Sequence, residues 1–301
     1  MRCAVRFHFS QVALINPSAG CVIAAYGYTI LSAALQAFRG NVMDLGIRGR
    51  TAIVCASSQG LGKGCAQALA EAGVALVING RNQALLEQTA QEIRQTWGVA
   101  VTPVLADVSN AEGQAALLHA CPTPDILINN NGGPPLRNFR ELDRKAMLDG
   151  VTSNMVTPIE LIQKVIDSMS ARGFGRIVNI TSQSVKMPIT GLDLSSGARA
   201  GLTAFMAGVA RSVADKNVTI NNLLPGNFDT ARLRNNLSLA AKRNQVSDAD
   251  SAARAMAAIP AKRFGTPAEF GQTCAFLCSV HAGFITGQNI LLDGGAYPAA
   301  F

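Results

Sequence analysis

Charged residues are scarce in this sequence of 301 residues, at 15%, whereas hydrophobic residues make up 49%. This balance excludes a disordered chain, because disorder requires low hydrophobicity and high charge. Aromatic residues amount to only 5%, and no run of Lys and Arg is interleaved with them. The formal net charge of +7 is therefore diffuse, and we expect no nucleic acid partner. Anionic small molecules stay open as ligands.

A paired cysteine framework is also missing, because the seven cysteines are odd in number and scattered. Cys55 and Cys121 have mostly apolar neighbours, which is typical of buried thiols in a reducing compartment. We therefore expect a cytoplasmic protein. Cys274 and Cys278 are spaced for one face of a helix, and only His281 lies at a fitting distance. Helix packing explains this pair better than a metal site, so we predict no metal.

Acidic residues are absent from the first 43 residues, which hold three arginines. The segment between Gly20 and Phe38 is apolar but interrupted by polar residues, and no small-residue cleavage site clearly follows it. A weak targeting segment is one explanation, and a true start at Met43 is the one we favour. We predict an N-terminal extension over 1–42, a domain over 43–301, and no membrane association of that domain.

From Thr51 onward, β-branched runs alternate with stretches of helical period. The predicted strands are Thr51–Cys55, Val74–Asn79, Val101–Leu105, Asp125–Asn130, Arg176–Ile180, Val218–Leu224 and Ile290–Leu292, and the main helices are Leu61–Ala72, Asn82–Trp97, Ala198–Ala214 and Pro267–Val280. The pattern predicts a single α/β domain, a Rossmann-like doubly wound seven-stranded parallel sheet with helices on both faces. Residues 227–262 are the least regular, and we expect them to form a mobile helical cap over the substrate.

A glycine-rich turn joins the first strand to the first helix. It consists of Ala56, Ser57, Ser58, Gln59, Gly60, Leu61 and Gly62. Such a turn directs backbone N–H groups and a helix N-terminus at a pyrophosphate, and its glycines allow close approach. Its position in the alternating chain predicts a dinucleotide site, although a plain turn without a ligand is the alternative.

The end of the second strand lacks the carboxylate that would hydrogen-bond the ribose of NAD. The sequence there reads Asn79-Gly80-Arg81-Asn82. Arg81 could instead pair with a 2′-phosphate, because its planar guanidinium suits phosphate oxygens. We therefore predict that NADP(H) is preferred and that NAD(H) is a second option, while an exposed arginine at a helix start is the alternative reading.

With these parts in place, residues from about 44 to 295 resemble the short-chain dehydrogenase/reductase family, and within it the β-ketoacyl-acyl-carrier-protein reductases. The resemblance rests on the turn and on Asp107-Val108, Asn129-Asn130-Asn131-Gly132, Asn154, Ile177-Val178-Asn179-Ile180-Thr181-Ser182, Pro225-Gly226 with Thr230, and Asp293-Gly294-Gly295. It implies that Asp107 and Val108 contact the adenine and that Asn129 to Gly132 form the sheet and ribose wall. It places Pro225, Gly226 and Thr230 beside the nicotinamide.

The resemblance also implies a catalytic set of Ser, Tyr, Lys and Asn. Ser182 and Asn154 match two of these positions, but Ser195 and Arg199 stand where the family has Tyr and Lys. A serine hydroxyl is far less acidic than a phenol, and arginine stays protonated, so the family's proton donation is incomplete. Arg199 could still bind ribose hydroxyls or stabilise an oxyanion.

No nearby tyrosine restores the missing phenol, since Tyr26 and Tyr28 lie in the extension and Tyr297 is near the C-terminus. Lys186 and Asp193 are the nearest ionisable substitutes, but we favour an ordinary surface charge as the explanation of each.

Smaller departures accompany this loss. Ala56 occupies the first glycine position of the turn, and Asn131 replaces an alanine, which would place an extra amide beside the cofactor. The segment Gly132–Pro135 predicts a stiff loop at the mouth of the crevice, or a mere turn.

Three functional hypotheses follow. The first is an NADP(H)-dependent oxidoreductase that reduces a carbonyl, such as a 3-oxoacyl thioester, or oxidises the matching alcohol, with Ser182 and Arg199 orienting the oxygen. The second is a catalytically degenerate NADP(H)-binding protein with a sensing or assembly role. The third is a structural domain without a nucleotide. Family analogy further implies a homodimer or homotetramer built on the last helices and the C-terminal strand.

Overall fold

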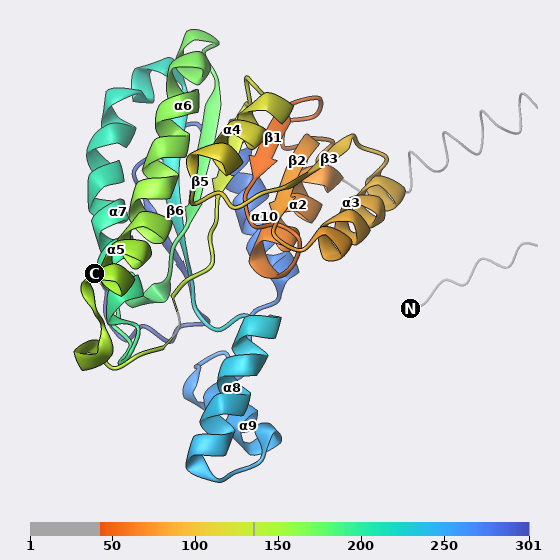
Figure 1. Ribbon diagram of the computed structural model, residues 1–301. Helices are drawn as coiled ribbons and strands as arrows, with labels where there is room; N and C mark the ends of the chain where they lie inside the picture. The colour runs from red at the N-terminus through yellow and green to blue at the C-terminus, as the bar shows by residue number, and fades with distance from the viewer. Residues whose placement is uncertain (1–42, 135, 301) are drawn as a thin grey trace, which may run out of the picture. The chain divides into compact units, whose positions relative to one another are not determined.

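The computed structural model describes residues 43–134 and 136–300, so the predicted extension over 1–42 lies outside the described residues. Residues Leu45–Phe301 form one compact unit. Its centre is a parallel sheet with the order β3-β2-β1-β4-β5-β6-β7 (Figure 1). The strands are β1 Thr51–Val54, β2 Ala75–Gly80, β3 Val101–Leu105, β4 Ile126–Asn129, β5 Gly175–Ile180, β6 Val218–Pro225 and β7 Asn289–Leu292. The predicted doubly wound sheet of seven strands is confirmed.

Helices cover both faces of this sheet. The α-helices are α2 Gly60–Glu71, α3 Gln83–Trp97, α4 Ala111–Ala120, α5 Arg144–Val151, α6 Thr157–Ala171, α7 Asp193–Ser212, α8 Ala231–Asn244, α9 Asp248–Ala258 and α10 Pro267–Cys278. One buried apolar cluster joins the sheet to α2, α3 and α10, and a second joins it to α4, α6 and α7. The sheet is therefore buried on both faces, as the apolar strands require.

Helix α7 begins at Asp193, five residues before the predicted start at Ala198. Two serines and Gly197 interrupt the apolar period at its beginning, and this made the first turn resemble a loop. The correction matters because it places Ser195 and Arg199 on the same helix, one turn apart. The predicted helical segment 227–262 is confirmed as α8 and α9, which project away from the sheet in Figure 1, whereas its mobility stays a prediction.

Helix α2 is held in place by close packing against α10. A Cβ at Gly64 would lie 2.2 Å from the Pro267 carbonyl oxygen, and one at Gly271 would lie 2.1 Å from the Gly64 carbonyl oxygen. Only glycine allows the two backbones to approach this closely. This contact fixes the direction of α2 and hence of the turn that precedes it.

A ladder of asparagine amides crosses the sheet near the carboxyl ends of its strands. Asn129 donates to Asn179 at 2.9 Å, Asn179 donates to Asn222 at 2.9 Å, and Asn222 donates to Asn289 at 2.8 Å. The four residues are in register on β4 to β7. Buried amides need such partners, so the ladder keeps the strand ends below the site aligned.

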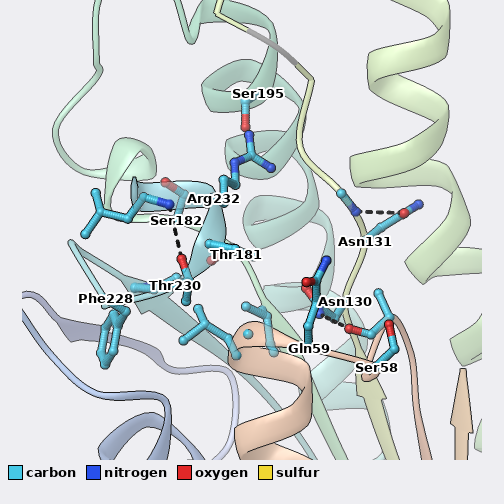
Figure 2. A pocket seen from close by; sticks show the side chains of 18 of the residues that line it. Ser58, Gln59, Asn130, Asn131, Thr181, Ser182, Ser195, Phe228, Thr230 and Arg232 are labelled. Atoms are coloured by element: carbon cyan, nitrogen blue, oxygen red, sulfur yellow. Dashed lines mark hydrogen bonds between the residues drawn. The ribbon is translucent and has the colours of Figure 1, made fainter. Parts of the chain in front are cut away.

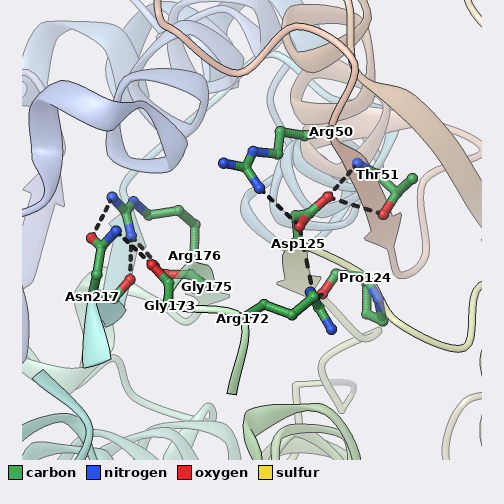
Figure 3. A network of polar contacts seen from close by, with 9 residues as sticks. All are labelled: Arg50, Thr51, Pro124, Asp125, Arg172, Gly173, Gly175, Arg176 and Asn217. Atoms are coloured by element: carbon green, nitrogen blue, oxygen red, sulfur yellow. Dashed lines mark hydrogen bonds and ion pairs between the residues drawn. The ribbon is translucent and has the colours of Figure 1, made fainter. Parts of the chain in front are cut away.

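The opposite end of the sheet carries polar contacts of a structural kind (Figure 3). Asp125 accepts hydrogen bonds from the Thr51 backbone N–H at 3.0 Å and from Arg50 at 3.2 Å. Arg176 is almost fully buried and donates to the carbonyl oxygens of Asn217 and Ser279 at 2.8 and 3.1 Å. These charges are satisfied within the protein and tie strands to their neighbouring loops.

The five described cysteines, Cys55, Cys65, Cys121, Cys274 and Cys278, are buried and unbridged. Within residues 43–134 and 136–300, no His, Cys, Asp and Glu side chains group so as to hold a metal ion. Among the helices of these same residues, none combines the length and apolar character that a membrane span needs.

Candidate active site

A cavity of about 580 Å³ opens at the carboxyl ends of the central strands (Figure 2). Most of the predicted site residues line it: Ala56, Ser58, Gln59, Gly60, Leu61, Arg81, Asp107, Val108, Asn130, Asn131, Gly132, Ser182, Ser195, Arg199, Pro225, Gly226 and Thr230. Ser57, Gly62, Asn129 and Asn154 do not line it and lie behind its wall. The structure thus brings together residues from every part of the domain.

The turn before α2 has the backbone geometry of an anion site. Gly60 has φ +60°, and Ala56 has φ +44°, a left-handed conformation that glycine adopts more readily. A Cβ at Gly62 would lie 2.4 Å from the Ala56 carbonyl oxygen and 2.9 Å from Asn130 Nδ2. Gln59 caps α2 without a side-chain hydrogen bond, so the first N–H groups of the helix stay available to a ligand.

Buried side chains hold this turn from beneath. Ser57 Oγ donates to the Val54 carbonyl at 2.6 Å and accepts from the Asn79 backbone N–H at 3.0 Å. The Asn79 side chain accepts from the Ala56 N–H at 3.2 Å, and Asn130 donates to the Ala56 carbonyl at 3.1 Å. Ser57 and Asn130 therefore position the turn, and Asn79 is a supporting residue that the sequence analysis did not assign.

The far end of the cavity carries one pair of opposite charges. Arg81 Nη1 lies 3.6 Å from Asp107 Oδ2, and 74% of the Arg81 side chain is exposed. Asp107 also accepts from the Ser109 backbone N–H at 2.9 Å. This hydrogen bond, helped by the Ser109 hydroxyl and then by the charge of Arg81, holds the pKa of Asp107 below its usual value against the effect of burial. Arg81 remains accessible to a second anion.

The side chain of Asn131 is occupied by the protein itself. Its Nδ2 donates to Ser109 Oγ at 2.9 Å and to the Ser153 carbonyl at 3.1 Å, and its Oδ1 accepts from the Gly132 N–H at 2.8 Å. The amide thus links the end of β4 to two neighbouring segments. Asn131 lines the cavity, as expected from the sequence, while its amide is held by contacts within the protein.

Arg199 is buried at the substrate end of the cavity, with 8% of the residue exposed. Its Nη1 donates to the Ile180 carbonyl at 2.7 Å, and its Nε donates to Ser195 Oγ at 3.3 Å. Burial, together with the nearby Arg232, lowers the pKa of Arg199 to about 10. The guanidinium is still a cation at neutral pH, and it faces the cavity without a carboxylate partner among the described residues.

Ser182 lies between β5 and α7, where it caps the short helix Gln183–Val185. Its Oγ accepts from the Ser184 backbone N–H at 3.1 Å. Because this contact uses an acceptor lone pair, the hydroxyl proton can be donated into the cavity. Ser182 and Arg199 are therefore two donors at the same end of the cavity.

Asn154 sits in a π-helical segment, Thr152–Val156, between α5 and α6. Such segments are rare and frequently accompany functional sites. Asn154 Oδ1, Asn129 Oδ1 and Thr157 Oγ1 are buried and have no hydrogen-bond partner within the protein. All three residues line a small second cavity of about 20 Å³ next to Arg199. The space and polar lining suit one water molecule.

The start of α8 forms one wall of the cavity, next to the glycine-rich turn. Thr230 caps this helix, accepting from the Leu233 N–H at 3.3 Å, and its Cγ2 lies 3.7 Å from a Cβ built at Gly60. Ala231, Arg232, Leu233 and Asn236 line the cavity as well. The sequence motifs marked Thr230 in this predicted cap, but no motif marks Ala231, Arg232, Leu233 or Asn236.

The family model described as Enoyl-(Acyl carrier protein) reductase matches residues 55–297. The chain is also 33% identical over 252 residues to the NADPH-dependent reductase BacG of Bacillus subtilis (strain 168), a match that covers 82% of this chain and 97% of the relative. The chain belongs to the short-chain dehydrogenase/reductase family. The resemblance drawn from the sequence motifs is confirmed.

Other members of the short-chain dehydrogenase/reductase family match over similar lengths. A 3-oxoacyl-[acyl-carrier-protein] reductase FabG of Vibrio cholerae is 30% identical over 257 residues, which is 84% of this chain and 99% of the relative. The crystal structure of YwfH, an NADPH-dependent reductase involved in bacilysin biosynthesis, has a TM-score of 0.78 at 31% identity, covering 83% and 99% of the two chains. L-sorbose reductase from Gluconobacter frateurii, complexed with NADPH and L-sorbose, has a TM-score of 0.81 at 26% identity, covering 85% and 100%.

On the sequence resemblance, Ser195 and Arg199 stand at the family's Tyr and Lys positions, beside the smaller departures at Ala56 and Asn131. Tyr297 is far from Lys186 in the sequence, but the fold brings the two residues together. The Lys186 Nζ lies 5.5 Å from the centre of the Tyr297 ring. The C-terminal segment therefore folds back beside the loop after Ser182. Neither Lys186 nor Tyr297 is among the residues that line the main cavity.

Proposed function

We propose that this protein is an NADP(H)-dependent oxidoreductase that reduces a carbonyl, such as a 3-oxoacyl thioester, or oxidises the matching alcohol. The similarity to NADPH-dependent BacG and to 3-oxoacyl-[acyl-carrier-protein] reductases, over 82% and 84% of this chain, supports this. The observation that carries the proposal is that Ser182 and Arg199 line the same cavity as the glycine-rich turn. A hydride source and a carbonyl can thus be held side by side.

The residues present fit a dinucleotide with a 2′-phosphate. Gly62 leaves the space that a Cβ would fill against Ala56, and the uncapped start of α2 offers N–H groups for a pyrophosphate. Asp107 and Val108 would bound the adenine. Arg81, exposed beside the cavity and without a neighbouring acidic residue other than Asp107, would pair with the 2′-phosphate.

The chain's own residues would polarise and hold the carbonyl. When bound, NADPH supplies the hydride that adds to the carbonyl carbon, and the electron pair of the C=O π bond moves to the oxygen. Ser182 Oγ donates a hydrogen bond to this oxygen, and Arg199 places a positive charge beside it. Removing one such donor in comparable sites costs on the order of 10² to 10³ in rate, so this pair can carry much of the catalysis without a phenol.

The oxyanion then needs a proton, which we assign to water in exchange with bulk solvent, where buffer acids replace the proton that the water gives up. Ser195 cannot supply it readily, because an aliphatic hydroxyl is a much weaker acid than a phenol. The small polar cavity lined by Asn154 and Thr157 lies next to Arg199 and can hold a water molecule. Proton delivery would thus run through water rather than through a side chain.

A steady-state screen of 3-oxoacyl thioesters, ketones and quinones with NADPH tests this proposal. We expect oxidation of NADPH with at least one of these classes and a large loss of rate in Ser182→Ala. Tight NADPH binding without turnover of any carbonyl would instead favour the degenerate binding protein, for which the paired loss of Tyr and Lys is the supporting observation.

We also propose a homodimer or homotetramer located in the cytoplasm. Phe284 is fully exposed, and Phe276 and Val280 are 38% and 46% exposed on the C-terminal side of the domain. Exposed apolar residues grouped in this way favour a protein interface. Light scattering of the purified protein gives the oligomeric state directly, and a monomer at micromolar concentration would contradict the proposal.

A further inference from the structure

The charges that line the main cavity are divided between its two ends. Among its lining residues, Asp107 is the single carboxylate, and it is paired with Arg81 at the adenine end. Arg199 and Arg232 line the substrate end. Neither takes part in an ion pair within the described part of the chain. The end where the carbonyl would bind is therefore cationic.

The loop after β4 holds the side chain of Arg232 at the mouth of the cavity. Its Nη2 donates to the Pro134 carbonyl at 3.2 Å. A Cβ at Gly133 would lie 2.9 Å from the same Nη2 and 3.0 Å from Nη1, so the guanidinium rests directly on the Gly133 backbone. The contact places the end of the Arg232 side chain on this loop, although a flexible side chain can move aside for a Cβ and so does not require glycine there. Although the residue is exposed at the rim, burial of its guanidinium lowers its pKa.

The positive charges of the two arginines repel each other, and this repulsion contributes to the lowered pKa of Arg199. Bringing two cations together in a partly closed space costs free energy unless an anion joins them. Backbone carbonyls satisfy only some of their N–H groups, and no contact of Arg199 Nη2 is formed within the described residues. An anionic ligand would remove this repulsion.

We propose that the substrate is a free oxo carboxylic acid, whose carboxylate is bound by Arg232 while its carbonyl oxygen lies between Ser182 and Arg199. The inference rests on the proposed function and narrows its substrate class. A guanidinium binds a carboxylate through two parallel hydrogen bonds, which fixes the orientation of the acid. A neutral ketone or ester group offers no negative charge there and would leave Arg232 without an anionic partner.

Matched acids and esters test this assignment. Pyruvate and acetoacetate are titrated into the NADP⁺-saturated protein by calorimetry, each beside its methyl ester, and all four are assayed as substrates with NADPH. We expect an acid to bind about tenfold or more tightly than its ester, since a charge-assisted pair contributes that much. Acids that bind no better than their esters, including no binding of either, overturn the inference.

The variants Arg232→Gln and Arg234→Gln separate the role of this site from a general effect of charge. Arg234 lies one half-turn further along α8, pairs with Asp229 and does not line the cavity. Arg232→Gln should abolish the preference for the acid and leave the NADPH affinity unchanged, whereas Arg234→Gln should change neither. A loss of NADPH affinity in Arg232→Gln would assign the arginine to the cofactor and overturn the inference.

The two proposals fail differently. If the oxidoreductase proposal is wrong, acids bind in preference to esters but no NADPH is consumed. If only the substrate class is wrong, NADPH is consumed with ketones or esters at least as fast as with the acids.

Discussion

The Nε of Arg199 donates to the Oγ of Ser195 across 3.3 Å, one turn apart on α7. The resemblance drawn from the sequence motifs places the family's Lys and Tyr at these two positions. The replacement has thus kept a cation and a hydroxyl in contact, with a guanidinium in place of an ammonium and a weak acid in place of a phenol. This pair can hold an oxyanion, but it cannot move a proton at neutral pH.

The first prediction concerns pH. Arg199 has a pKa of about 10 and therefore stays cationic through the neutral range. Deprotonation of Arg199 should thus not lower the kcat of the wild type as the pH rises towards 9. In Arg199→Lys, burial should lower the lysine pKa from its ordinary value of about 10.4, because it disfavours the charged form. Activity that needs the cation would then be lost as pH rises through this lower value. Superimposable profiles of the two proteins would contradict the role of the charge.

The second prediction concerns cofactor choice. Arg81→Ala should weaken NADPH binding by about tenfold, a modest effect because the side chain is 74% exposed and its charge is screened by water. NADH has no 2′-phosphate and serves as the control, so its affinity should stay the same. Calorimetric titrations give both values. An equal loss of affinity for NADPH and NADH would mean that Arg81 supports the fold of the site and does not bind the 2′-phosphate.

The third prediction concerns the glycine-rich turn. Gly62→Ala forces a Cβ against the Ala56 carbonyl, which should lower the free energy of unfolding by about 1–3 kcal/mol and weaken NADPH binding. Gly208→Ala is the matched control, since a Cβ there meets nothing within 4 Å. In the middle of α7 it should raise stability by about 0.5–1 kcal/mol. Denaturant unfolding of both variants measures this contrast, and equal effects would refute the packing argument.

The fourth prediction concerns the asparagine ladder. Asn179→Ala removes the donor to Asn222 and the acceptor of Asn129 inside the sheet, which should cost about 2–4 kcal/mol of unfolding free energy. Asn289→Ala, at the exposed end of the same ladder, should cost under about 1 kcal/mol, because water can replace the lost contact. If thermal or denaturant unfolding gave the same loss for both, the buried hydrogen bonds would not be the cause.

The sequence predicted the sheet well because its five central strands are largely apolar runs buried on both faces. Each of the seven predicted strands agrees with the structure to within two residues. The start of α7 was wrong because Ser195, Ser196 and Gly197 hide a helical turn whose stability comes from tertiary packing. Local pattern carries no information on such packing.

The site was predictable where a motif marks it and not elsewhere. Ser182 and the glycine-rich turn have fixed spacings, so sequence alone located them. Arg232 and Gly133 are about a hundred residues apart, and their contact exists only because the β4 loop and α8 meet in the fold. The proximity of Tyr297 to Lys186 was missed for the same reason.

Transfer of deuterium from NADPH labelled at C4 of the nicotinamide tests the central claim most directly. The wild-type protein is incubated with the labelled cofactor and the oxo acids and ketones above, and the alcohols are analysed by mass spectrometry. The account predicts one deuterium per product from one face of the nicotinamide, with a rate reduced about a hundredfold or more in Arg199→Met. Tight NADPH binding with no deuterium in any product would contradict it.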